Sequence, residues 1–420
     1  MVWRFFLTDT TQVATQRGLA CLATLSITFL TAAAASAGEA VETLRVLLYP
    51  YVPHRLALFQ KIEHQFEKDH PGINLELVEN DAIINGYYSG ELQKASADVY
   101  EVDTVLLSDM IAAGKASVIN ITQAGFSKEA IQAVTRDNKA YGIPRWVCGN
   151  FLFYRKGDQA LEKAKTWQDV TAILKSRNQS LLVDFKGKST LGEWYFTALA
   201  QLKGVNPAQA EISSSAPLNQ DVVNSLNGIV AACPDGYCRS NDLHDRTGFY
   251  ARAFISGQSS AYVGYSESIH YGLQYALDNC TQTSGCLSPD QIAVRDLPAF
   301  TQLPKSRGMG WVDALTIDAS LQGAKRQLAT KFIDFMVSDA TYKSILKPEY
   351  GEAPRYLLPA KENISIEDAP LYPSFYQAHR GRDTGSRLGL NEKLRAAGKS
   401  LDCGLAIDRN DAATKQACQK

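Results

Sequence analysis

Apolar positions in the first part of the chain follow two spacings, one typical of strands and one typical of helices. The short apolar run Leu44–Tyr49, closed by Pro50, predicts a strand. The segment Leu56–Lys68 predicts a helix, because its apolar side chains recur at helical spacing: Leu56, Phe59, Ile62 and Phe66. The His70-Pro-Gly72 turn ends that helix, and Ile73–Val78 then alternates apolar and polar residues as a strand does.

The same alternation of strand and helix continues along the chain. Val99–Leu107 reads as a strand, Ser108–Lys115 as the helix after it, and Lys325–Ser338 as a later amphipathic helix. This order predicts an α/β fold with a parallel sheet covered by helices on both faces. Such sheets bind ligands at the carboxyl ends of their strands, so we expect a site in the loops that follow the strands.

Composition narrows the class of protein. The 420 residues include 43 Lys and Arg against 44 Asp and Glu, and no basic stripe indicates a nucleic-acid surface. The six histidines are scattered, and neither zinc-ligand spacing nor a phosphate-binding glycine loop is present, so we expect no metal and no cofactor. About 380 residues follow the N-terminal segment, which is more than one hydrophobic core usually holds, so two domains are expected.

The N-terminus predicts export. Arg17 precedes an apolar run from Leu19 to Ala35, and Ala35-Ser36-Ala37 fits a signal-peptidase site before Gly38. A membrane anchor is the alternative, although the run is short for a spanning helix and no stop-transfer cluster follows it. We therefore expect residues 1–37 to be a signal peptide and the mature chain to be secreted or periplasmic. We also expect the mature chain to be a monomer without stable membrane association.

Cysteine spacing singles out one thiol. Of eight cysteines, Cys21 lies in the predicted signal peptide, and six of the others form three close pairs that we predict to be disulfides: Cys233 with Cys238, Cys280 with Cys286, and Cys403 with Cys418. Cys148 is left without a partner. An odd thiol in a disulfide-forming compartment is either a deeply buried structural residue or is kept for its reactivity.

The order of segments resembles that of extracytoplasmic solute-binding proteins. The resemblance covers most of residues 44–360 and rests on these pieces: Phe59…Phe66-Glu67…Pro71-Gly-Ile73, Ala97-Asp98-Val99…Asp103…Leu107, Asn138-Lys-Ala-Tyr-Gly-Ile-Pro144, Tyr154-Arg-Lys156, Phe254-Ile-Ser-Gly-Gln258 and Lys331-Phe-Ile-Asp-Phe-Met336. It implies a two-lobed fold of the type II periplasmic binding class, with a central cleft and crossover hinges. The implied first lobe holds residues 38–145 and about 270–345, and the second holds about 146–269 and 346–420.

Within this fold, the surroundings of Cys148 resemble those in the thiaminase I family. The matching pieces are Arg145-Trp-Val-Cys148-Gly-Asn-Phe-Leu-Phe-Tyr154, Tyr262-Val-Gly-Tyr-Ser-Glu267-Ser, Gly310-Trp-Val-Asp313-Ala and Leu48-Tyr49-Pro-Tyr51. The resemblance implies a transferase that cleaves thiamin and passes its pyrimidinylmethyl group to a nitrogenous base or a thiol. The three cysteine pairs depart from the pattern of the thiaminase I family.

The chemistry explains two of these residues. A thiolate can add to a pyrimidine carbon beside nitrogen and push electron density toward the leaving thiazolium, which makes Cys148 the candidate nucleophile. An ordinary thiol is only slightly ionised at neutral pH, so a base is needed, and Glu267 is the candidate. A carboxyl buried in a cleft has a raised pKa, which suits that task. The plain alternative for Glu267 is a helix cap.

Other polar and aromatic residues are candidates for substrate binding. Aromatic faces suit a planar cation, and carboxyl groups suit an aminopyrimidine or a thiazolium. Each of them has an ordinary alternative as a cap, loop anchor or packing residue. The candidates are Tyr49, Tyr51, Tyr88, Asp98, Asp103, Trp146, Tyr250, Tyr265 and Asp313. The competing hypothesis for the whole chain is a non-catalytic extracytoplasmic protein that binds thiamin or another small solute for a transporter.

Overall fold

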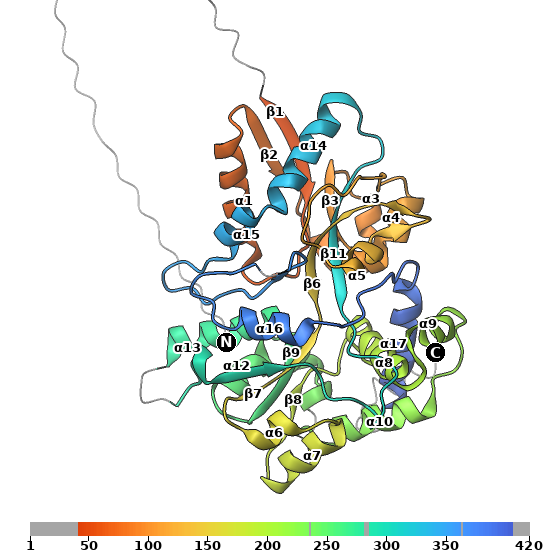
Figure 1. The fold of residues 1–420 in the computed structure, drawn as a ribbon, viewed down its shortest axis with the longest axis vertical. Helices are drawn as coiled ribbons and strands as arrows, with labels where there is room; N and C mark the ends of the chain where they lie inside the picture. Colours follow the sequence, from red (N-terminus) through yellow and green to blue (C-terminus); the bar gives the residue numbers. More distant parts are fainter. Residues whose placement is uncertain (1–40, 235–236, 281–284, 363, 406–420) are drawn as a thin grey trace, which may run out of the picture. The chain divides into compact units, whose positions relative to one another are not determined.

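The computed structural model describes residues 41–234, 237–280, 285–362 and 364–405, which belong to one compact unit. A six-stranded sheet and a four-stranded sheet organise this unit, and Figure 1 shows them in the upper and lower parts of the view. We call each sheet with its helices a lobe, the first lobe being built on the six-stranded sheet. The predicted two-lobed α/β fold is confirmed.

The sheet of the first lobe is mixed. Its order is β12-β6-β11-β3-β1-β2, and the strand bounds are β1 (Glu42–Leu47), β2 (Ile73–Leu77), β3 (Val99–Asp103), β6 (Ile143–Cys148), β11 (Trp311–Ile317) and β12 (Leu358–Pro359). Strand β1 runs parallel to β2 and β3, as expected, but β11 runs antiparallel to both β3 and β6. The all-parallel prediction was wrong here because β11 enters the sheet from the second lobe rather than through a helical crossover.

The second lobe has a smaller sheet of order β10-β7-β9-β8. Its strands are β7 (Asn150–Arg155), β8 (Leu182–Val183), β9 (Ala261–Tyr265) and β10 (Ile292–Arg295). Strands β8 and β9 are parallel, whereas β7 is antiparallel to β9 and β10. A separate hairpin joins β4 (Thr135–Arg136) to β5 (Lys139–Ala140).

Helices surround both sheets. In the first lobe they are α1 (Arg55–Asp69), α2 (Asp81–Gly86), α3 (Glu91–Lys94), α4 (Leu107–Ala112), α5 (Lys128–Ala133), α14 (Gly323–Met336) and α15 (Asp339–Leu346). In the second they are α6 (Gln159–Lys163), α7 (Trp167–Ser176), α8 (Lys188–Lys203), α9 (Val205–Ser213), α10 (Gln220–Val230), α11 (Asn241–His244), α12 (Phe249–Ile255), α13 (Ile269–Asn279), α16 (Tyr372–His379) and α17 (Asn391–Gly404).

Helix α1 shows why the apolar spacing produces this packing. Phe59, Ile62 and Phe66 are buried as predicted, and the Phe66 ring meets Phe332 of α14 with centroids 5.1 Å apart. Leu56 was expected in the same stripe but is 57 % exposed, and Leu58 is buried instead. The buried face of the helix therefore includes Leu58 in its first turn and leaves Leu56 outside it.

Strand pairing differs from the predicted lobe boundaries at three places. Strand β6 lies entirely in the first sheet, β12 joins it there, and β10 pairs with β7 in the second sheet. The prediction had put residues 270–345 in the first lobe and 346–420 in the second. The chain crosses between the sheets at Gly149 and again between β10 and β11. The prediction instead changed lobe after residues 145, 269 and 345, and it therefore assigned the end of β6, β10 and β12 to the other lobe. The exact residues at which each lobe begins and ends as a domain stay a prediction.

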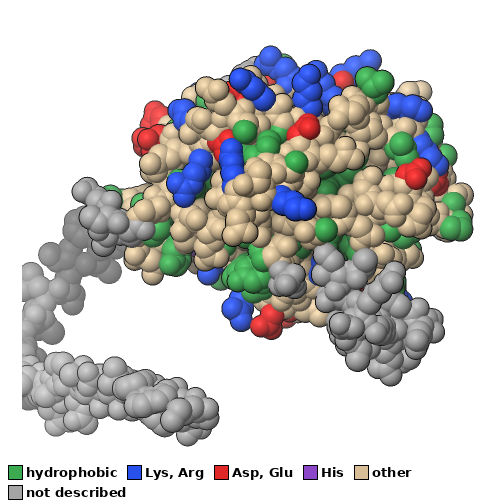
Figure 2. Space-filling view, turned by 90° about the horizontal axis from the view of Figure 1, so that it is seen from below, with side chains coloured by type: hydrophobic (Ala, Val, Ile, Leu, Met, Phe, Trp, Pro, Cys, Tyr) green, Lys and Arg blue, Asp and Glu red, His purple; other side chains and the backbone are tan. Residues whose placement is uncertain are grey.

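Two surface properties bear on the expected class of protein. Among the described residues, no helix is both long enough and apolar enough to cross a bilayer. On the face shown in Figure 2, several Lys and Arg side chains gather along the upper edge, and the others lie among hydrophobic and uncharged ones. The predicted signal peptide, residues 1–37, lies outside the described residues.

Candidate active site

Cys148 lies where the chain passes from one sheet to the other. It is the last residue of β6, where it pairs with Trp311 of β11, and Asn150 begins β7 opposite Tyr265 of β9. Only Gly149 separates the two strands, and Figure 1 shows β6 descending to meet the second lobe. The residue is partly exposed, and in the described part of the chain it is the one cysteine outside a disulfide.

Two of the predicted disulfides are present. Cys233 bonds to Cys238, and Cys280 bonds to Cys286. The third predicted pair joins Cys403 to Cys418, which lies outside the described residues.

Two aspartates of the first lobe face each other beside Cys148. Asp103 ends β3, Asp313 lies opposite it on β11, and both are buried. Burial, followed by the charge of Asp103, raises the pKa of Asp313 well above its ordinary value. Burial also raises the pKa of Asp103 to about 6, although its carboxylate accepts hydrogen bonds from Val105 N and from the Tyr88 hydroxyl at 3.0 and 2.9 Å.

Two glutamates of the second lobe complete the acidic surroundings. Glu267 lies in a single 3₁₀ turn between β9 and α13, where Ser266 donates a 3.1 Å hydrogen bond to its carboxylate. Loss of solvent raises the pKa of Glu267 to about 7. Glu193 of α8 accepts a hydrogen bond from the Tyr265 hydroxyl, and loss of solvent raises its pKa to about 8.

The four carboxyl groups act together on the thiol. Burial raises the pKa of Cys148 well above its ordinary value, and the charges of Asp313, Glu267, Asp103 and Glu193 add to that effect in this order. The resting thiol is therefore neutral. It needs a base to take its proton, and the site contains carboxyl groups whose pKa values lie near neutrality.

Tyrosines form one wall of the site. Tyr51 stacks on Tyr88 with centroids 6.0 Å apart and planes 6° from parallel, and the Tyr49 and Tyr88 hydroxyls are 3.1 Å apart. A buried ion pair lies behind them: Tyr49 N donates to Glu101 at 2.9 Å, and Glu101 pairs with Arg145 at 2.5 Å. Because both partners of that pair are 1 % exposed, they hold the strands rather than meet a ligand.

A cavity of about 530 Å³ opens beside these groups. Its walls include five of the aromatic and acidic side chains discussed so far: Tyr51, Tyr250, Tyr262, Tyr265 and Glu267. Cys148 is not itself a lining residue, but Asn150, two residues after it, and its cross-strand partner Tyr265 are.

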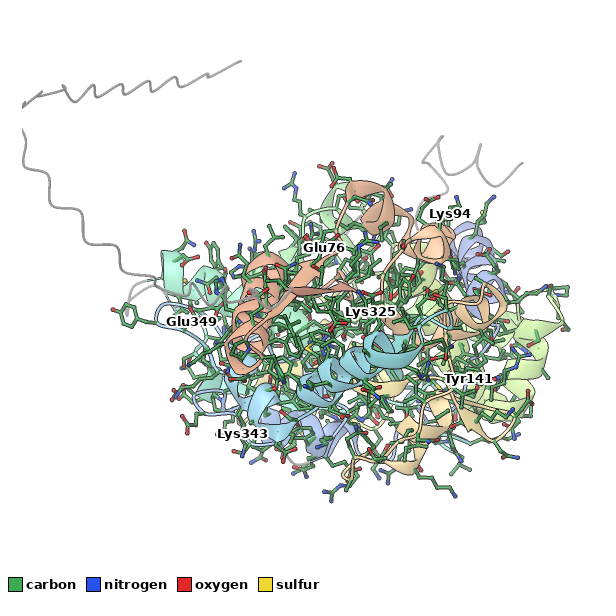
Figure 3. The ribbon with its side chains drawn as sticks, turned by 90° about the horizontal axis from the view of Figure 1, so that it is seen from above. Glu76, Lys94, Tyr141, Lys325, Lys343 and Glu349 are labelled. Carbon is green, nitrogen blue, oxygen red and sulfur yellow. A yellow bond between two sulfur atoms is a disulfide. The ribbon has the colours of Figure 1, made fainter. Side chains whose placement is uncertain are left out.

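Two predicted site residues lie elsewhere. Asp98 precedes β3, at the opposite end from Asp103, and its carboxylate accepts Arg45 N at 2.7 Å and pairs with Lys325 at 3.1 Å. Lys325 lies near the start of α14 on the face seen in Figure 3, the upper one in Figure 1. The prediction that Asp98 faces the cleft is corrected, because only residues at the carboxyl end of β3 reach it. Trp146 is 2 % exposed and packs on Tyr342 in the core.

Three features of the site were not predicted from the sequence. Glu193 is a lone acid in the apolar run of α8, and that isolation was the available signal. Arg382 is 3 % exposed and joins the two crossings, because it donates to Asn150 O at 2.7 Å and to Asp296 at 3.0 Å. The third feature is a pair formed by Asp184 and His244 on the cavity wall. No cluster of metal-binding side chains is present among the described residues.

Comparison with known proteins identifies the family to which this arrangement is related. Residues 149–283 match the model of the Thiaminase-1 domain. The chain is also 26 % identical over 358 residues to Thiaminase-1 of Paenibacillus thiaminolyticus, which is 80 % of each sequence. The middle of the chain is thus similar to a thiaminase-1 domain. The matched segment holds Glu193 and Glu267, and it begins one residue after Cys148.

Solved structures show the same similarity at the level of fold. Thiaminase I from Bacillus thiaminolyticus matches with a TM-score of 0.72 at 24 % identity, covering 87 % of this chain and 100 % of that one. Clostridium botulinum thiaminase I in complex with thiamin matches with a TM-score of 0.67 at 22 % identity, covering 85 % and 98 %. The binding protein RafE in complex with raffinose matches at 0.62 and 15 % identity, covering 90 % and 99 %. The comparisons support a thiaminase I enzyme on a solute-binding-protein fold.

Proposed function

We propose that this protein cleaves thiamin between its pyrimidine and thiazolium rings and transfers the pyrimidinylmethyl group to a small nucleophile, either a nitrogenous base or a thiol. The thiaminase-1 domain supports the reaction class. The observation that carries the proposal is the position of the Cys148 thiol, which is outside any disulfide, among four carboxyl groups at the junction of the lobes. A thiazolium ring is a cation, and a site rich in carboxylates favours a cation.

Cys148 is the proposed nucleophile. Its sulfur adds to the pyrimidine carbon beside nitrogen, and the electron pair gained by the ring then expels the thiazole from the methylene carbon with the electrons of the C–N bond. An exocyclic methylene remains on the ring. When the acceptor adds to that methylene, the ring electrons return and the bond to Cys148 breaks, which restores the thiolate.

Glu267 is the proposed base for the thiol. Its pKa of about 7 is high enough to accept a proton effectively and low enough that the carboxylate is populated near neutral pH. Asp103 and Asp313 are proposed to hold the aminopyrimidine or to face the thiazolium. Tyr49, Tyr51, Tyr88, Tyr250 and Tyr265 are proposed to supply aromatic faces to the planar cation, with about 0.5–2 kcal/mol from each favourable contact.

The setting of the reaction is part of the proposal. Export through the predicted signal peptide would put the enzyme in an oxidising compartment, and the disulfides Cys233–Cys238 and Cys280–Cys286 suit such a compartment. Thiamin and one small nucleophile are the proposed partners, and the mature protein is proposed to act as a monomer.

A single assay tests the proposal against its alternative. Purified mature protein is incubated with thiamin and pyridine, and the product masses are read. We expect free thiazole and a pyridinium adduct of the pyrimidinylmethyl group. A non-catalytic solute-binding protein would return intact thiamin, and that result would overturn the proposal.

A further inference from the structure

Asp184 and His244 form a hydrogen-bonded pair on the wall of the same cavity as Glu267. The His244 Nδ1 lies 2.7 Å from Asp184 Oδ2, and the two side chains are 34 % and 31 % exposed. Within the described residues no hydrogen bond to the His244 Nε2 is present, so that atom can meet a molecule in the cavity. A histidine held on one nitrogen by a carboxylate is the usual arrangement of a general base.

The topology of the second sheet explains why this pair and Glu267 share a cavity. Strands β8 and β9 run parallel, with Val183 beside Val263. Asp184 follows β8 and Glu267 follows β9, so both lie at the carboxyl edge of the sheet, where α/β sheets place their ligands. Tyr262 lines the same cavity; burial raises the pKa of its hydroxyl, and the charges of Glu267 and Asp184 raise it further.

Gly187 allows the histidine ring to approach the strand. A Cβ at this position would lie 2.9 Å from Cε1 and 3.2 Å from Nε2 of His244, and the glycine φ is +84°. Any larger residue would therefore displace the ring as well as strain the backbone. The loop between β8 and α8 is thus shaped around His244.

The charges around His244 favour its protonated form. The hydrogen bond to Asp184 raises the pKa of His244, the charges of Asp184 and Asp245 act in the same direction, and partial burial and Lys186 oppose them. A higher pKa makes the neutral imidazole a stronger base, provided that the pH is high enough to populate it.

We propose that His244, oriented by Asp184, is the base that takes the proton of the acceptor nucleophile. This inference rests on the transfer reaction proposed above. In the second half of that reaction, the acceptor sulfur forms a bond to the exocyclic methylene carbon, the ring electrons move back and expel the Cys148 thiolate, and the acceptor S–H proton passes to His244 Nε2. A pyridine acceptor has no such proton, so its transfer does not need this step.

Internal competition between two acceptors tests the role. Thiamin is offered together with pyridine and 2-mercaptoethanol in one mixture, and the ratio of thioether to pyridinium product is measured by mass. The ratio does not depend on how much of a variant is folded. His244→Gln is expected to lower the thioether share about 10²-fold relative to wild type, the lower end of the range for a lost general base. Asp184→Asn should change the ratio in the same direction.

His54→Gln is the matched control. His54 is a partly exposed histidine beside Glu352, outside the cavity wall, and its replacement should leave the ratio at the wild-type value. An unchanged ratio in His244→Gln would overturn the inference, because a purely structural His244–Asp184 pair affects both products equally. If the wild type formed neither product, the transfer reaction itself would be at fault rather than the role of His244.

The wild-type protein supplies a second measurement. As pH rises, the thioether share should reach a plateau once His244 is neutral. That plateau should come at a lower pH than the ionisation of 2-mercaptoethanol, an alkyl thiol that loses its proton only in the alkaline range. A share that follows the ionisation of the free thiol throughout would contradict a protein base.

Discussion

Asp313 on β11 lies directly opposite Asp103 on β3, and both carboxyl groups are buried beside Cys148. Loss of solvent raises the pKa of both carboxyl groups, and repulsion from the charge of Asp103 raises that of Asp313 further. A bound cation relieves that repulsion. The pair therefore gives the first lobe an affinity for positive charge at the point where the second lobe presents Glu193 and Glu267.

Replacement of Glu267 tests its role as the base. Glu267→Gln keeps the shape of the side chain but cannot accept a proton. We expect turnover to fall about 10²–10⁴-fold with a much smaller change in thiamin affinity. In the wild type, kcat should rise with pH through about 7, because the carboxylate is the active form, and this acid limb should vanish in the variant. If the variant loses only thiamin affinity, Glu267 is not the base, and Asp103 or Asp313 would be tested in its place.

The raised carboxyl pKa values predict how stability depends on pH. The values of about 6, 7 and 8 for Asp103, Glu267 and Glu193 exceed those of unfolded carboxyl groups, so the folded state binds more protons than the unfolded state in this range. Their contribution to stability is present below the ordinary carboxyl pKa and is lost as pH rises through these values.

Thermal unfolding measures this effect. We expect the dependence of Tm on pH between about 5 and 8 to be weaker in the Glu193→Gln, Glu267→Gln double variant than in the wild type. Thiamin should also raise the Tm of the wild type more at pH 8 than at pH 5, since its cation pairs with ionised carboxylates. A ligand effect that is equal at both values would contradict a cation held by these groups.

Arg382 is expected to support the crossing that carries Cys148. Its guanidinium donates to Asn150 O and pairs with Asp296, and it lies 4.1 Å from the Phe151 ring centroid. Arg382→Met should cost about 1–3 kcal/mol of unfolding free energy, because the carbonyl and the carboxylate lose a charged donor. The control is Lys347→Met, which removes an exposed pair with Glu367 and should cost much less, because solvent screens that pair. Equal losses in denaturant titrations would contradict this role.

Thiol counting tests the cysteine assignment. Under denaturing, non-reducing conditions the mature chain should react with one equivalent of thiol reagent, at Cys148. Peptide mapping should recover Cys233 with Cys238, Cys280 with Cys286, and Cys403 with Cys418. Three or more reactive thiols would show that at least one predicted pair does not form.

The sequence suggested candidate site residues where a local pattern singles out a position. An odd cysteine pointed to Cys148, and the end of an apolar strand pointed to Asp103. The same reasoning failed for Asp98. An aspartate before a strand and an aspartate at its end give the same sequence signal, but only the carboxyl end of β3 meets the second lobe. Glu193, Arg382 and His244 were missed because each reaches the site from a different element, so their proximity depends on tertiary packing that no local pattern encodes.

The central claim is that Cys148 is the nucleophile, and Cys148→Ser tests it most directly. Serine is nearly isosteric with cysteine but far less nucleophilic at neutral pH, so thiamin cleavage with pyridine as acceptor should fall about 10³-fold or more. Calorimetric titration should show that the variant still binds thiamin, which separates lost chemistry from a lost fold. Turnover close to that of the wild type in this variant would contradict the account.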